Sequence, residues 1–205
     1  MGKHLNIMGT RGVPGRHGGY ETFATRFAPY MAQRGWTVTV YCQLDQGEAP
    51  FVDEWEGVRR VHYAPRTGGT AGTMEFDART VAHVLRQPGI DLVLGYNTAA
   101  FNIPQKIAGR RLAMNMDGIE WKRGKWSAAG KTWFFLNELI GANLCDLLIA
   151  DHPEIERHLS GKTRRPIAMI PYGGDEVLDA PVEDRKSTTS ELQSRRNLVC
   201  RLLPE

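Results

Sequence analysis

The chain has 205 residues, a length that suits one domain and part of a second. Its formal net charge is +3, and no segment concentrates lysine and arginine, which argues against a nucleic-acid-binding protein. Its three cysteines, Cys42, Cys145 and Cys200, are far apart without a CxxC pair, as is typical of reduced thiols in a cytoplasmic protein.

Short apolar runs alternate with amphipathic helical patterns over residues 4–173. In chain order the sequence predicts strand 4–9, helix 20–35, strands 37–42 and 58–64, helix 74–87, strand 91–96, helix 99–108, strand 111–117, helix 128–145, strand 146–151, helix 153–160 and strand 166–173. Strands separated by helices of this length favour a mostly parallel sheet covered on both faces. We therefore predict an α/β fold, a three-layer Rossmann-like domain with about seven strands.

The pattern stops after Asp175, so we expect one domain over residues 1–175. Residues 176–205 continue neither a strand nor a helix of the sheet, and we expect a truncated linker with a non-native end from about residue 183. A native helix over 188–203 is the alternative.

The amino-terminal residues MGKHLNIMG become polar too quickly for a signal peptide. No apolar run approaches the ~20 residues that a membrane-spanning helix needs. We expect a cytoplasmic protein, and peripheral contact with the inner face of the plasma membrane stays open.

The segment GTRGVPGRHGGYE, residues 9–21, follows the first predicted strand and holds five glycines. Ligands of parallel α/β sheets bind at the carboxyl ends of the strands, where glycine allows close approach of the backbone. Amides at the start of the next helix favour an anion such as phosphate. The segment therefore predicts a phosphate-binding loop, with an unoccupied surface turn as the alternative.

The glycine spacing excludes the commoner nucleotide motifs. Gly9-x-x-Gly12-x-x-Gly15 is not the GxGxxG of dinucleotide folds, and the second strand, TVTVYCQ, lacks the acidic residue that would bind a ribose. NAD is therefore disfavoured. The six histidines form no HxH or HxxxH pair, so we expect no metal site.

Four segments resemble a known enzyme family in the same order: GTRGVPGRHGGYETFA, MNMDGIEWKRGKW, ADHPEI and IPYGGD. They resemble the N-terminal domain of bacterial sugar transferases in the rhamnosyltransferase-like branch of glycosyltransferase family 4. The resemblance covers about residues 4–175 and implies one half of a GT-B fold. It implies that a second Rossmann-like domain, absent from this chain, binds most of the nucleotide-sugar.

The resemblance also implies the reaction: retaining, metal-independent transfer of a sugar, with rhamnose suggested, to a glycan or lipid-linked acceptor in polysaccharide biosynthesis. No cofactor is implied, because the nucleotide-sugar is a substrate. We expect this chain alone to be inactive. A non-catalytic nucleotide- or sugar-binding module is the alternative, and an NAD-dependent sugar-nucleotide oxidoreductase is a third.

In such enzymes the first glycine-rich loop approaches the diphosphate of the donor. On this sequence the close-approach positions would be Gly12, Gly18 and Gly19, with Arg11 or Arg16 adding positive charge. Glu21, in the first turn of the next helix, would bind the acceptor or the loop itself. Its alternative role is to stabilise the helix dipole.

The segment MNMDGIEWKRGKW follows the fifth predicted strand. Asp117 ends that strand and would orient or deprotonate an acceptor hydroxyl, or else bond to local amides. The resemblance leads us to expect acceptor contacts from the residues that follow: Glu120, Trp121, Lys122 and Arg123. The tryptophan would stack on a sugar or pack beneath the loop, and the cations would bind a pyrophosphate, an anionic membrane or only water.

The fourth predicted strand ends in GYNTAAF, where Tyr96 and Asn97 offer a hydroxyl and an amide to an acceptor sugar. Asn97 and Thr98 would alternatively cap the following helix.

Overall fold

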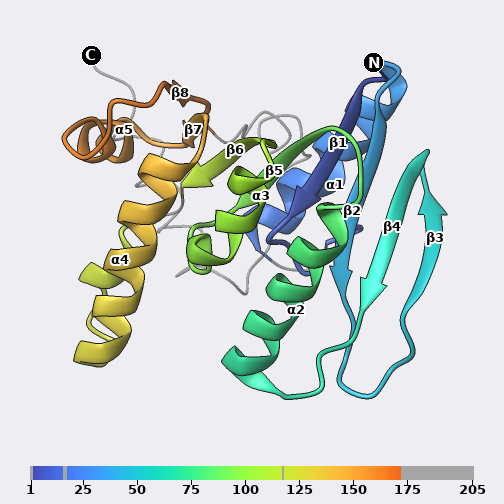
Figure 1. Ribbon diagram of the computed structural model, residues 1–205, viewed down its shortest axis with the longest axis horizontal. Helices are drawn as coiled ribbons and strands as arrows, with labels where there is room; N and C mark the ends of the chain where they lie inside the picture. The colour runs from blue at the N-terminus through green and yellow to red at the C-terminus, as the bar shows by residue number, and fades with distance from the viewer. Residues whose placement is uncertain (1, 16–17, 117, 172–205) are drawn as a thin grey trace, which may run out of the picture. The chain divides into compact units, whose positions relative to one another are not determined.

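The computed structural model describes residues 2–15, 18–116 and 118–171, and these residues belong to one compact unit (Figure 1). The strands are β1 (His4–Met8), β2 (Thr37–Gln43), β3 (Phe51–Trp55), β4 (Val58–Tyr63), β5 (Ile90–Leu94), β6 (Arg111–Met116), β7 (Leu147–Ala150) and β8 (Ile167–Met169). The helices are α1 (Gly19–Gln33), α2 (Gly69–Val84), α3 (Ile103–Ile107), α4 (Ala128–Leu144) and α5 (Pro153–Ser160), with short 3₁₀ turns η1 (Ala99–Asn102) and η2 (Glu120–Lys122).

The described strands form one sheet of eight in the order β3-β4-β2-β1-β5-β6-β7-β8. Every neighbouring pair is parallel except β3 and β4. Strand β1 lies at the centre: β2, β4 and β3 follow on one side of it, and β5 to β8 follow on the other. The loop after β1 therefore lies at the point where the strand order reverses. That point is where doubly wound sheets bind ligands.

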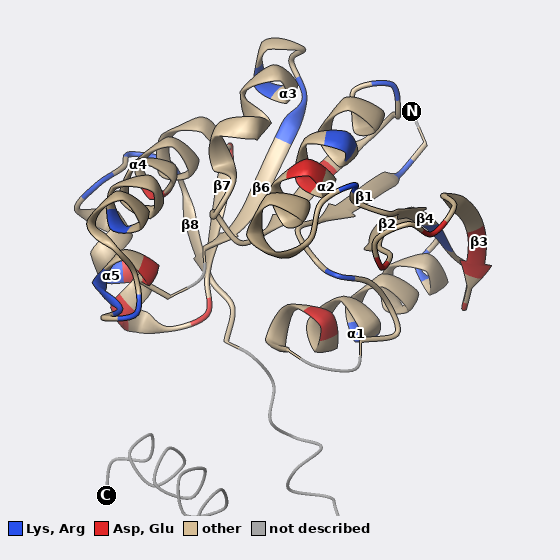
Figure 2. Cartoon of the chain, turned by 90° about the horizontal axis from the view of Figure 1, so that it is seen from below, with Lys and Arg blue, Asp and Glu red and all other residues tan. Residues whose placement is uncertain are grey.

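Helices cover both faces of the sheet, which confirms the predicted three-layer Rossmann-like architecture. Figure 2 shows α1 on one face and α2, α3 and α4 on the other. Ala24 and Ala28 of α1 pack with Ile7 in one core cluster, whereas Phe76 of α2 packs with Tyr41 in another. The central strands β1, β2 and β5 are buried on both faces, as their nearly continuous apolar sequences require.

The sequence prediction of about seven strands missed β3. This edge strand is mostly exposed and pairs antiparallel with β4 through a tight turn at Glu56 and Gly57, both of which have positive φ. Its Asp53 accepts hydrogen bonds from Arg60 and contacts His62 across the hairpin. Because backbone pairing and ion pairs hold this strand in place, its sequence shows no clear apolar pattern from which the strand could be predicted.

Helix α2 begins five residues before the predicted start at 74. Residues 69–73, which the sequence predicted as loop, are helical. A Cβ added at Gly72 would lie 2.1 Å from the Thr67 carbonyl oxygen. Small residues therefore allow this first turn to pack against the preceding loop. The predicted tail, residues 176–205, lies outside the described residues.

Candidate functional site

A cleft of about 990 Å³ opens at the carboxyl edge of the sheet. Its floor comes from the ends of β1, β2 and β5, and its walls come from α2 and the start of α4, which stand apart in Figure 1. Residues 9–11 of the glycine-rich loop line the cleft. The carboxyl ends of parallel strands and the loops after them thus surround one hollow.

Gly9 shows why the loop needs glycine. Its φ is +79°, and an added Cβ would lie 2.2 Å from the carbonyl oxygen of Leu94 on β5. No side chain is compatible with that separation. The loop therefore leaves β1 in close contact with β5 and passes directly over the floor of the cleft.

Glu21 holds the glycine-rich loop against α1. Its carboxylate accepts a hydrogen bond from the backbone N–H of Arg11 at 3.2 Å. Gly18, with φ +102°, comes so close to this carboxylate that an added Cβ would lie 2.2 Å from its Oε2. Of the two predicted functions of Glu21, the structure shows the contact with the loop.

The structure brings only some of the predicted donor-site residues to the cleft. Arg11 lines it, as does the predicted acceptor residue Glu21, but Gly12 and Gly18 do not, and Gly12 packs against the side chain of Cys42. Gly19 has no atom within 4 Å of an added Cβ, so no contact among the described residues requires glycine there. Arg16 lies outside the described residues.

The expectation that Tyr96 binds an acceptor is wrong. Its side chain is 1% exposed, and its hydroxyl donates to the Gly118 carbonyl oxygen and accepts from the backbone N–H of Glu120. Tyr96 therefore holds the loop after β6 rather than facing the cleft. Asn97 does line the cleft, and its carbonyl oxygen accepts from the Trp133 indole at 2.9 Å.

Glu120 is also buried, at 5% exposure, which contradicts its predicted contact with an acceptor. Its carboxylate accepts from the Trp126 indole at 3.2 Å and pairs with Arg123 at 2.9 Å and with Lys125 at 3.7 Å. Three donors from one loop converge on this carboxylate, so it organises the segment that follows β6.

Trp121, Lys122 and Arg123 do not line the cleft either. The Trp121 indole donates to Glu138 of α4 at 2.9 Å, and its ring packs edge-on against Phe135. Lys122 and Arg123 are exposed. The alternative in which this tryptophan packs beneath its loop is the one that the structure shows. Asp117, the predicted catalytic residue, lies outside the described residues.

Sequence reasoning missed Asp77 of α2, which lines the cleft. Burial raises the pKa of its carboxyl from 3.8 to about 6, against a smaller lowering by a hydrogen bond from Thr98. The signal was present: Asp77 lies four and seven residues before the buried Val81 and Val84, so it stands on the inner stripe of the helix. Thr98 accordingly binds Asp77 and does not cap η1 with its side chain.

The family follows from the sequence. Residues 2–175 match the sequence model of a family described as "Domain of unknown function (DUF1972)". The chain belongs to this family. A search of curated protein sequences found no match.

Three solved structures share the fold of the DUF1972 chain. A sucrose-phosphate synthase structure from Thermosynechococcus elongatus is 13% identical with a TM-score of 0.58, over 97% of this chain and 99% of the other. Escherichia coli trehalose-6-phosphate synthase bound to UDP-2-fluoro-glucose is 8% identical (TM-score 0.54), over 95% of this chain and 55% of the other. Phytolacca americana UGT2 with UDP-2-fluoro-glucose and pterostilbene is 7% identical (TM-score 0.53), over 83% and 54%.

These similarities establish the fold: the DUF1972 domain is one half of the GT-B architecture of glycosyltransferases. The chain spans about half the length of the E. coli and Phytolacca proteins. Over the described ranges, no three His, Cys, Asp or Glu side chains gather as they would around a metal ion. None of the helices in those ranges has the length and hydropathy of a membrane span.

Proposed function

We propose that this DUF1972 domain is the acceptor-side half of a glycosyltransferase that moves a sugar from a nucleotide-sugar to a hydroxyl acceptor. The observation that carries the proposal is the glycine-rich loop, which lines a cleft of about 990 Å³ at the switch point of the sheet. Two proteins with the same fold were solved with UDP-2-fluoro-glucose, a nucleotide-sugar analogue.

The cleft offers one cation to a departing diphosphate. Among the described residues that line it, Arg11 is the single cation, and it lies on the loop where β1 ends. The N-terminus of α1 follows that loop and has no side-chain cap from Gly18, and the positive end of a helix dipole favours an anion. Stabilising negative charge that develops on the leaving group would be the main task of this half of the site.

The finer features are inferred from the resemblance to glycosyltransferase family 4 and its rhamnosyltransferase-like branch. We propose retaining transfer without a metal, to a glycan or lipid-linked acceptor in bacterial polysaccharide biosynthesis. In this mechanism the leaving diphosphate helps to accept the proton of the acceptor hydroxyl, and Asp117 would orient that hydroxyl. The cations Lys122, Arg123 and Lys125 are exposed on the loop after β6, and they would favour the anionic inner face of the plasma membrane.

The experiment is a transfer assay on the longer protein that carries the second domain. Mass spectrometry would follow sugar transfer from a panel of UDP- and dTDP-sugars to oligosaccharide and lipid-linked acceptors. We expect transfer from one donor, and Arg11→Ala should lower kcat/KM about tenfold or more because one charge-assisted contact to phosphate is lost. Arg34→Ala, at the opposite end of α1, is the control.

Two results would contradict the proposal. Binding of nucleotide-sugars without transfer to any acceptor would identify a non-catalytic binding module instead. Equal activity of the Arg11→Ala and Arg34→Ala proteins would show that the glycine-rich loop does not contribute to the donor site.

A further inference from the structure

Asp77 presents an open hydrogen-bond acceptor in the wall of the cleft. Its Oδ2 accepts from the Thr98 hydroxyl at 2.7 Å, while Oδ1 has no hydrogen-bond partner within residues 2–15, 18–116 and 118–171. No cation among these residues pairs with the carboxylate; on the same helix, Arg79 pairs with Glu75 instead. Asp77 is partly buried and lines the cleft, so its open oxygen can accept a hydrogen bond from a ligand that enters there.

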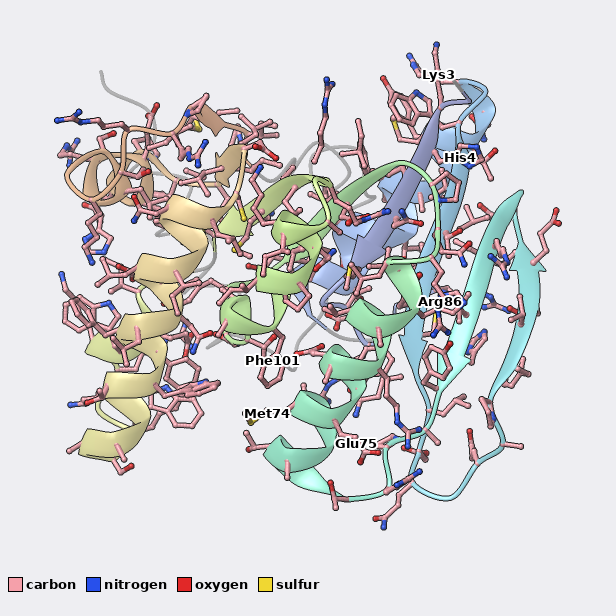
Figure 3. The ribbon with its side chains drawn as sticks, viewed as in Figure 1. Lys3, His4, Met74, Glu75, Arg86 and Phe101 are labelled. Atoms are coloured by element: carbon pink, nitrogen blue, oxygen red, sulfur yellow. The ribbon has the colours of Figure 1, made fainter. Side chains whose placement is uncertain are left out.

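Apolar side chains line the same cleft as this carboxyl. Met74 and Phe101 lie in the space between α2 and α4, and Glu75 points away from it (Figure 3). Trp133 of α4 lines the same space, held by its hydrogen bond to Asn97 and by edge-on contact with Phe101. The indole is therefore fixed in place before a ligand arrives.

Charge limits what can bind beside Asp77. The charged side chains that line the cleft, within the described part of the chain, are Arg11, Glu21, Asp45 and Asp77 itself. Arg11 lies on the glycine-rich loop, so neither α2 nor α4 brings a cation to this region. A phosphate here would meet a carboxylate without compensation, whereas a neutral hydroxyl group can donate to it.

We propose that Asp77, Thr98 and Trp133 form a subsite for a neutral pyranose ring, in which Asp77 Oδ1 accepts a hydrogen bond from a ring hydroxyl. The apolar face of the sugar packs against the aromatic wall made by Trp133 and Phe101. That this sugar belongs to the acceptor rests on the proposed function; the binding of a pyranose does not. A site built around such a hydroxyl discriminates strongly against ligands that lack it.

Saturation-transfer NMR on this chain tests the subsite directly. The ligands are methyl α-glucopyranoside, methyl β-galactopyranoside and methyl α-rhamnopyranoside, with tetrahydropyran as the analogue without hydroxyls. We expect saturable binding of at least one pyranoside and none of tetrahydropyran. Asp77→Leu, which keeps the side-chain volume but removes the acceptor, should raise the dissociation constant at least about tenfold.

Glu75→Gln is the matched control, because Glu75 belongs to the same helix but lies outside the cleft. Its dissociation constant should match that of the unaltered chain, and circular dichroism should confirm that both variants are folded. If Asp77→Leu does not fold, Thr98→Val provides the second variant, and we expect it to weaken binding severalfold. Failure of every pyranoside to saturate below about 100 mM, or equal binding by the Asp77→Leu and Glu75→Gln chains, overturns the subsite.

The longer protein separates this inference from the proposed function. If pyranosides bind through Asp77 but no nucleotide-sugar supports transfer, the subsite stands and the proposed function fails. If transfer occurs and Asp77→Leu leaves the KM for the acceptor unchanged, the subsite fails and the proposed function stands.

Discussion

At the scale of single residues, the balance of burial and hydrogen bonding decides what each polar side chain can do. Tyr96 and Glu120 come from segments at the ligand-binding edge, yet both side chains turn inward and hold the backbone or side chains of the loop after β6. Asp77 comes from the middle of a helix and meets the cleft. Proximity to the edge in sequence is therefore a poor guide to contact with a ligand.

The raised pKa of Asp77 predicts a pH-dependent gain in stability on its replacement. Its pKa is about 6 in the folded chain, against 3.8 as the ordinary value, so the folded state binds more protons between these values. Stability therefore falls as pH rises from about 4 to about 6. Asp77→Asn should raise the free energy of unfolding at pH 7.5 by up to about 3 kcal/mol, and by less as the pH approaches 4.

Urea titrations at pH 4.5 and 7.5 measure this difference. The control, Glu75→Gln, breaks the ion pair with Arg79 on the same helix and should be slightly destabilising at pH 7.5 rather than stabilising. An Asp77→Asn effect that is the same at both pH values would show that burial does not shift this carboxyl.

At the scale of elements, the junction between the glycine-rich loop and α1 depends on the close approach of Gly15 and Gly18 to Glu21. Gly18→Val would place a β-branched residue at φ +102° and drive its Cβ into the Glu21 carboxylate. We expect a loss of about 1–3 kcal/mol in the free energy of unfolding and loss of transfer in the longer protein.

Gly19→Val is the matched control, because an added Cβ at Gly19 meets no atom within 4 Å. It should leave stability within about 0.5 kcal/mol, as measured by thermal unfolding. Equal effects of the two substitutions would mean that the contact between Gly18 and Glu21 does not organise the loop.

A second junction joins α4, α5 and η2 through Glu138, which is 2% exposed. Its carboxylate contacts His158 at 2.9 Å, accepts from the Trp121 indole at 2.9 Å and binds the ammonium of Lys162. Glu138→Gln leaves Lys162 without its counter-charge and should destabilise the chain by about 3 kcal/mol in urea titrations. Glu154→Gln, at an exposed site on α5, should change stability little, and comparable losses would contradict the role of Glu138.

At the scale of the whole molecule, the fold matches one half of the two-domain GT-B architecture, and we infer that a second domain supplies the rest of the donor site. The cleft of this half supplies Arg11 as its cation within the described residues, whereas a diphosphate carries several negative charges. We predict that this chain alone shows no sugar transfer, while the longer protein does. Mass spectrometry of both proteins under the same conditions measures this, and normal turnover by the chain alone would refute it.

The order and type of the main elements could be predicted because hydrophobic periodicity is local. Strand 37–42 is read from TVTVYC, and helix 153–160 from its own residues, with bounds that the structure reproduces closely. The sequence pattern did not predict strand β3, because β3 is an exposed edge strand. It also did not predict the start of α2, because glycine and threonine are poor helix formers.

The sequence by itself determined that a parallel sheet carries a glycine-rich loop at its ligand-binding edge, since both features are properties of contiguous residues. Only the tertiary structure decided which polar groups meet the cleft. Thr98 and Asp77 are 21 residues apart, and their hydrogen bond exists because α2 crosses the sheet to lie beside the loop after β5. Burial and side-chain direction depend on such distant packing, which no local pattern encodes.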